Sequence, residues 1–154
     1  MKHWVIAACA AGMLGCAGLA CADEGRTVTL KADDVIAARQ EVYDLMSAVV
    51  VSMKDTVQSG GDVKDYKDAA EAIATWGRIA PSMFPDGTQE GHDTHAKPNI
   101  WSDREGFTKA AANLSEQATK LAQVADSGDK AAFADQFKAT TAACGACHKV
   151  YKSR

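Results

Sequence analysis

The spacing of apolar residues is the feature that most constrains the fold of this chain. It follows the period of an α-helix in four stretches, residues 32–57, 63–80, 102–127 and 129–152, and no stretch alternates convincingly like a strand. The connections between these stretches are short, long and short. Four amphipathic helices of roughly 20 residues joined in this way predict an all-α fold, an antiparallel four-helix bundle.

Start and stop signals support these limits. Gly60 and Gly128 follow the first and third stretches, as glycine does at helix C-termini. Pro81 follows the second, and proline cannot continue the helical hydrogen bonds. Ser102 with Glu105 three residues later predicts a capping box at the start of the third helix.

The N-terminus predicts a secretory signal over residues 1–22. Lys2 precedes an apolar run over residues 4–19, and Ala20-Cys21-Ala22 is a small-x-small cleavage pattern. Glycines interrupt the run, which argues against a membrane-spanning helix. A lipid-anchored variant, modified at Cys16 or Cys21, stays open.

Removal of 22 residues from 154 leaves 132, enough for one domain over residues 23–154. That domain has 16 basic residues (17 minus Lys2) and 20 acidic ones, so its net charge is −4. A nucleic-acid-binding domain would show a clustered basic face, so we expect no nucleic-acid partner. Of the five cysteines, only Cys144 and Cys147 lie beyond the signal.

Those two cysteines belong to the motif Cys144-Gly145-Ala146-Cys147-His148. On a helix, positions i, i+3 and i+4 share one face, so both sulfurs and the imidazole point the same way. This arrangement suits covalent attachment of one haem c, with His148 as the axial ligand of the iron. Alanine is abundant along the helix seams, and a cavity filled by a cofactor would explain a core with few large residues.

Two other interpretations of the motif are weaker. A redox dithiol needs a helix N-terminus to lower the thiol pKa, whereas this pair lies near a helix C-terminus. A structural zinc site needs four ligands, and no second cysteine pair lies beyond the signal. His92 and His95 are the other histidines beyond the signal, and they lie in the long connection.

With this motif on its last helix, the chain resembles the class II c-type cytochromes, in particular cytochrome c′. The segments that match the family pattern are Arg39-Gln40, Leu45-Met46, Phe84-Pro85, Lys97-Pro98, the run from Ile100 to Asp103, Phe107, and the run from Cys144 to Tyr151. The resemblance implies an up-down-up-down bundle with covalent haem. It further implies that Arg39 and Gln40 hold a haem propionate. Trp101 is expected to pack against the haem or to cap the end of the bundle.

The resemblance also places the fourth residue after Arg39, Tyr43, over the face of the iron opposite His148. A phenol there leaves the iron five-coordinate and crowds an incoming diatomic ligand. Met46 lies one turn along the same helix face and is the alternative sixth ligand.

These expectations favour a periplasmic c-type cytochrome with a five-coordinate iron that binds NO or CO and exchanges electrons with redox partner proteins. The alternative is a low-spin electron-transfer cytochrome with Met46 on the iron. We expect no enzymatic activity, because the first helix offers no histidine–arginine pair for splitting peroxide. The resemblance also implies a homodimer.

Overall fold

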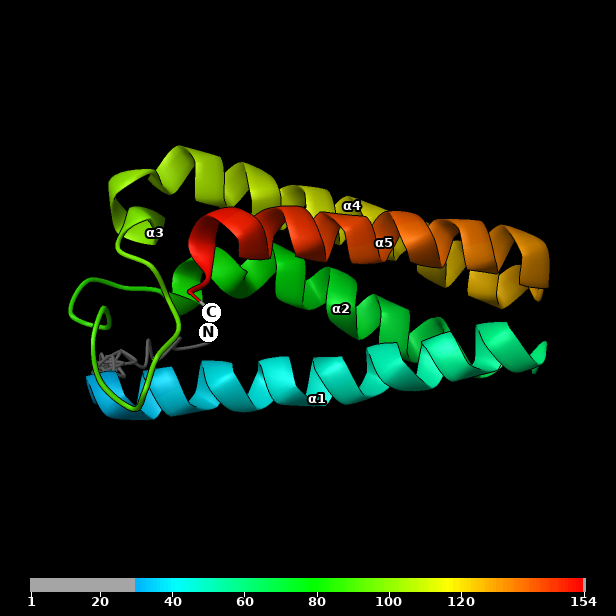
Figure 1. Cartoon of the computed structure of the whole chain (residues 1–154), viewed down its shortest axis with the longest axis horizontal. Helices are drawn as coiled ribbons and strands as arrows, with labels where there is room; N and C mark the ends of the chain where they lie inside the picture. The colour runs from blue at the N-terminus through cyan, green and yellow to red at the C-terminus, as the bar shows by residue number, and fades with distance from the viewer. Residues whose placement is uncertain (1–29, 154) are drawn as a thin grey trace, which may run out of the picture.

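The structure is a computed structural model and describes residues 30–153 (Figure 1). The predicted signal over residues 1–22, with Cys16 and Cys21, lies outside the described residues. No helix between residues 30 and 153 is long and apolar enough to cross a membrane.

Four long helices form the bundle, and they run alternately up and down (Figure 1). They are α1 (Ala32–Ser59), α2 (Lys67–Ile79), α4 (Arg104–Ser127) and α5 (Lys130–Tyr151). Short helical turns flank α2 and precede α4, namely η1 (Lys64–Tyr66), η2 (Ala80–Met83) and α3 (Asn99–Ser102). The predicted all-α, up-down-up-down bundle is confirmed.

The glycine stops also agree with the sequence. Gly60 and Gly128 have φ values of 70° and 74°, which are left-handed and favour glycine. Their amides bond back to the carbonyl oxygens of Thr56 and Ala125.

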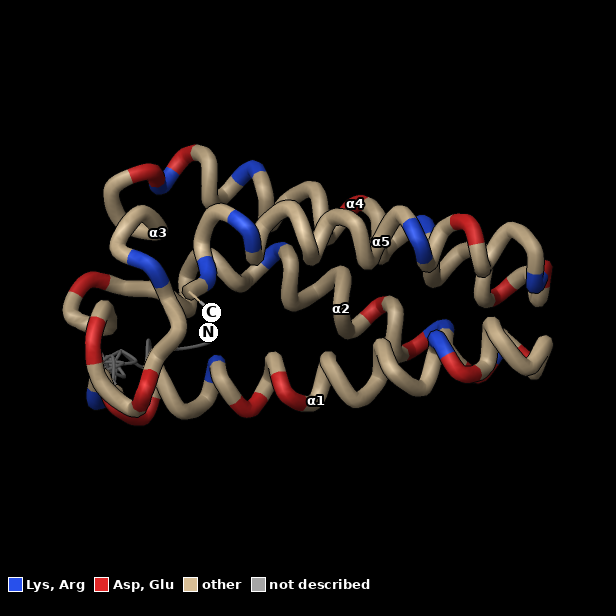
Figure 2. Tube along the Cα trace, viewed as in Figure 1, with Lys and Arg blue, Asp and Glu red and all other residues tan. Residues whose placement is uncertain are grey.

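Figure 2 shows acidic and basic positions interspersed along the long helices.

The predicted cap of the third helix is wrong by one residue. Ser102 is the last residue of α3, and the Asp103 carboxylate accepts the bond from the Gly106 amide at 3.1 Å. The predicted partner Glu105 instead pairs with Lys109, at 2.6 Å. The extra turn of α3 moves the start of α4 past Ser102.

The core consists of two clusters at opposite ends of the bundle. The loop-end cluster comprises Phe84, Ile100, Phe107 and Tyr151. The far-end cluster comprises Met53, Val63, Ala70, Ile73, Ala74, Ala118, Leu121, Ala122, Ala125 and Phe133. Half of the far-end cluster is alanine, so its helices pack closely.

Candidate functional site

A cavity of about 420 Å³, open to solvent on one side, lies between the helices of the bundle, and residues packed on both clusters contribute to its walls. Its volume is in the range of small-molecule and cofactor sites. It is lined by Tyr43, Met46, Ser47, Val50, Val51, Trp76, Gly77, Ala80, Phe107, Ala110, Ala111, Leu114, Thr141, Cys144, Gly145, Cys147 and His148. All four long helices therefore form its walls.

Helix α5 brings Cys144, Cys147 and His148 to this cavity on one face, as the spacing predicts. The helix starts at the cap residue Asp129, whose carboxylate accepts bonds from two amides at 3.0 Å. Both cysteines are free thiols. Burial raises the pKa of each thiol, so the pair lacks the thiolate character that a redox dithiol needs.

His148 lies on the cavity wall and is also exposed to solvent. Partial burial lowers the pKa of its imidazole, and the nearby positive charge of Lys152 lowers it further. The ring is therefore neutral at pH 7, which is the form that ligates a metal ion.

Helix α1 contributes Tyr43 and Met46 to the cavity. Tyr43 packs against the loop-end cluster, as Cys147 does, whereas Met46 packs against the far-end cluster. The Tyr43 ring meets the Trp76 ring edge to face, with 5.3 Å between centroids and 88° between planes. Burial raises the pKa of the Tyr43 phenol to about 12, so its hydroxyl stays protonated at neutral pH.

Arg39 is absent from the cavity lining and instead holds the connection over residues 84–98. Its guanidinium donates to Thr88 Oγ1 at 2.9 Å, Thr88 O at 2.8 Å and Thr94 Oγ1 at 3.0 Å, and lies 4.3 Å from the centre of the Phe84 ring. It is only 2% exposed. The partners Thr88 and Thr94 carry no sequence signal, since threonines are common in loops.

Gln40 and Trp101 also bond to this connection rather than line the cavity. Gln40 Nε2 donates to the carbonyl of His92 at 2.9 Å, and Trp101 Nε1 donates to that of Pro85 at 3.1 Å. The structure thus brings together Tyr43, Met46 and the α5 motif, and it places the other predicted residues beside them. The predicted contacts of Arg39, Gln40 and Trp101 with a haem stay predictions.

Sequence reasoning missed Trp76 as a site residue, because its helical spacing is that of ordinary core. It is buried at the cavity wall, and its Nε1 has no hydrogen-bond partner. The zinc interpretation gains no support, since residues 30–153 contain no group of three possible metal ligands.

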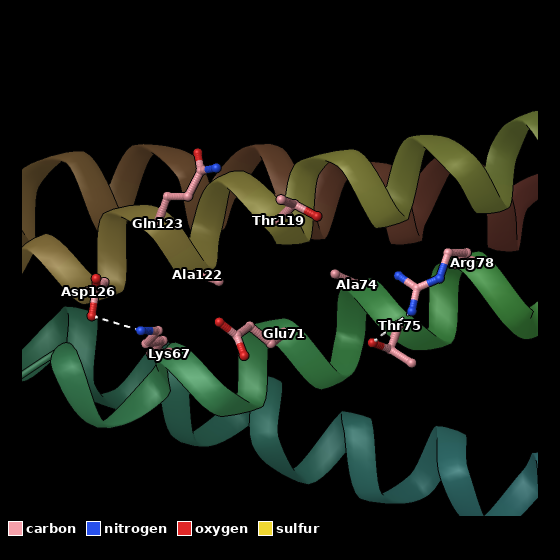
Figure 3. Close-up of a pocket in the computed structure, with 9 residues that line it drawn as sticks. All are labelled: Lys67, Glu71, Ala74, Thr75, Arg78, Thr119, Ala122, Gln123 and Asp126. Carbon is pink, nitrogen blue, oxygen red and sulfur yellow. Dashed lines mark hydrogen bonds and ion pairs between the residues drawn. The ribbon is translucent and has the colours of Figure 1, made fainter.

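A second hollow, of about 490 Å³, lies between α2 and α4 (Figure 3). Charged side chains line it, and Lys67 Nζ crosses it to Asp126 Oδ1 at 3.1 Å. Both side chains are about half exposed or more, so this is a solvated surface groove.

A four-helix bundle with an internal cavity and a Cys-x-x-Cys-His motif on its wall defines a c-type haem protein. The cytochrome c′ family profile matches residues 34–152. The chain therefore belongs to the cytochrome c′ family, whose members carry covalently bound haem c.

Relatives and solved structures agree. Cytochrome c′ of Rhodospirillum rubrum is 35% identical over 70% of this chain and 71% of its own length. A cytochrome c′ with an unusual ligand-controlled dimer dissociation is 26% identical and superposes over 82% of this chain and all of its own, with a TM-score of 0.76. Variants of cytochrome c′ from Alcaligenes xylosoxidans, solved with nitric oxide and with carbon monoxide, are 28% identical over 82% of this chain and 99% or 100% of their own, with TM-scores of 0.73.

Proposed function

We propose that this protein is a periplasmic cytochrome whose haem iron is five-coordinate, and which binds NO or CO and exchanges electrons without catalysing a reaction. The observation that carries the proposal is the place of Tyr43 in the cavity. Its phenol packs in the same cluster as Cys147, where a side chain opposite His148 would lie. A neutral phenol is a poor ligand for ferrous iron, so Tyr43 crowds the site without closing it.

The residues on α5 suit covalent haem. Cys144 and Cys147 would form the thioether links, and the neutral imidazole of His148 would supply the axial nitrogen. Mostly apolar walls, with Val50, Leu114 and Phe107 among them, suit a porphyrin. When bound, the haem supplies an iron that accepts a diatomic ligand and changes oxidation state.

Two wider features belong to the same proposal. The predicted signal would export the chain to the periplasm. Leu45 on α1 and Ile79 at the end of α2 are 68% and 42% exposed, which supports a homodimer through the outer faces of the first two long helices. The neighbour with ligand-controlled dimer dissociation makes a link between dimer and ligand worth testing here.

The alternative is a low-spin electron carrier with Met46 as sixth ligand. It is favoured by one observation, namely that Met46 lines the same cavity one turn from Tyr43. Met46 also packs against the far-end cluster, which favours a packing role over ligation of the iron. Methionine commonly has this role in protein cores.

Carbon monoxide binding to the haem-loaded protein separates the two functions. We expect the reduced wild-type protein to bind CO, and Met46→Leu to bind it with unchanged affinity. Met83→Leu is the matched control, because Met83 lies outside the cavity lining. CO binding in Met46→Leu alone would show that Met46 occupies the iron.

A further inference from the structure

Trp76 has an unsatisfied polar atom in a place where such atoms are rare. The residue is 6% exposed, and its indole Nε1–H has no hydrogen-bond partner. About nine in ten buried polar groups have a partner, so an orphan donor needs an explanation. Trp76 lines the cavity together with Tyr43, so the partner of this N–H is sought among the groups at the cavity wall.

The hydroxyl of Tyr43 lies close to this N–H. The two rings meet edge to face at 5.3 Å, and the Trp76 N–H opposes part of the rise that burial causes in the pKa of Tyr43. The N–H and the hydroxyl are therefore neighbours whose present geometry falls short of a full hydrogen bond.

The backbone beside the indole is closely packed. The next residue, Gly77, lies where an added Cβ would come within 2.7 Å of Ser115 N and 2.9 Å of Ala111 O. Helix α2 thus lies directly against α4 beside Trp76. The indole is buried, whereas Tyr43, on α1, is only partly buried.

We propose that Trp76 and Tyr43 form a hydrogen-bond relay for a small ligand whose outer atom is an acceptor. Trp76 Nε1–H donates to Tyr43 Oη, and the Tyr43 O–H then donates into the cavity. The order is fixed because an indole can only donate, whereas a phenol both accepts and donates. Trp76 is a positioning residue that acts through Tyr43. The inference rests on the proposed function, in which a diatomic ligand enters this cavity.

The relay predicts a ligand preference beyond steric crowding. A donor aimed at the outer atom of a diatomic stabilises ligands that gain negative charge there, while an apolar wall does not. With a phenol protonated up to high pH, the donor is present throughout the neutral range.

The test uses the haem-loaded, reduced protein with CO as the probe. The C–O stretching frequency and the CO dissociation rate are measured for wild type, Trp76→Phe, Tyr43→Phe and the double variant. Removing a donor from the outer oxygen raises the stretching frequency. We expect Trp76→Phe to raise it and to speed dissociation roughly two- to ten-fold, the range for one hydrogen bond. Trp76→Phe keeps an aromatic ring, so a purely packing role would leave the frequency unmoved.

Coupling decides whether the two residues act in series. In a relay, the double variant changes no more than Tyr43→Phe alone. Tyr66→Phe is the matched control, because its hydroxyl bonds Ser52 and Thr56 outside the cavity. An unchanged frequency in Trp76→Phe, or additive shifts in the double variant, would overturn the relay.

Failure of the proposed function gives a different result. If the wild-type protein binds no CO, the five-coordinate assignment is wrong. The same four proteins are then compared in the Met46→Leu background, where the frequency shifts still support or overturn the relay.

Discussion

Three residues on one face of α5 are those that we propose to carry the chemistry of this site. Cys144, Cys147 and His148 share that face, and all three line the cavity. Burial keeps the cysteines as thiols and the histidine neutral, which suits attachment and axial ligation respectively. The division of roles between sulfur and nitrogen can be tested residue by residue.

Replacing both Cys144 and Cys147 with serine removes the predicted thioether links. We expect such a protein to lose its pigment on denaturing gel electrophoresis, where covalent haem stays with the chain. His148→Ala should keep the covalently attached haem. It should lose the NO binding that we expect of the wild-type protein. Unchanged NO binding in His148→Ala would contradict the axial role.

Arg39 is a buried cation with no carboxylate among its hydrogen-bond partners. A buried charge needs partners, and here carbonyl and hydroxyl oxygens of residues 83–94 provide them. Burial lowers the pKa of its guanidinium. The side chain thus ties the first turns of α1 to the long connection.

We expect Arg39→Lys to loosen that connection, because an ammonium cannot reproduce a planar set of bonds. Hydrogen exchange over residues 84–98 should quicken by roughly ten-fold or more, as expected when hydrogen bonds to a charged group are lost. The control is Arg78→Lys, whose side chain is exposed and makes one long bond, to Thr75. Equal exchange in both variants would show that Arg39 does not order the loop.

Between elements, the close contact of α2 with α4 shapes one side of the cavity. Gly77 makes it possible, since any larger residue would meet the backbone at Ser115 and Ala111. Glycine is otherwise unfavourable inside a helix, which indicates that close approach outweighs propensity here.

Gly77→Ala should therefore destabilise the protein despite its better helix propensity. Overpacking costs roughly 1–3 kcal/mol and the propensity gain offsets up to about 1, so we expect a loss of about 1–2 kcal/mol in the free energy of unfolding. Chemical denaturation of the haem-loaded protein measures it. Ala72→Gly, on the exposed side of α2, reports the propensity alone. A more stable Gly77→Ala protein would refute the close-contact account.

The helices were predictable from the sequence because the spacing of apolar residues and the glycines at helix ends are features of the local sequence. The limits of α1, α4 and α5 differ from the predicted ones by two residues or fewer. The start of α2 and the cap of α4 were less predictable, because the turns η1 and α3 depend on packing at the bundle ends. Asp103 caps α4 only because α3 ends at Ser102.

Over the whole molecule, the cavity separates two small cores. The far-end cluster is half alanine and the loop-end cluster is mainly aromatic, so neither fills the middle of the bundle. The α5 side of the site was predictable from the motif spacing. Trp76 and the partners of Arg39 were not, because their roles arise from contacts between residues far apart in sequence.

A cavity of this size predicts that the fold depends on its cofactor. Its walls are mostly apolar, so a bound haem would remove much apolar surface from water and stabilise the packing of the four helices. We expect the haem-free Cys144→Ser/Cys147→Ser protein to keep helical circular dichroism and lose its near-ultraviolet signal. A cooperative melt near that of the haem-loaded protein would contradict this.

The most direct test of the five-coordinate site is the visible and EPR spectrum of the haem-loaded wild-type protein, oxidised and reduced, with and without CO. We expect a high-spin reduced form whose spectrum shifts when CO is added, with Tyr43 beside an open position on the iron. A low-spin form that ignores CO would contradict it and assign Met46 to the iron.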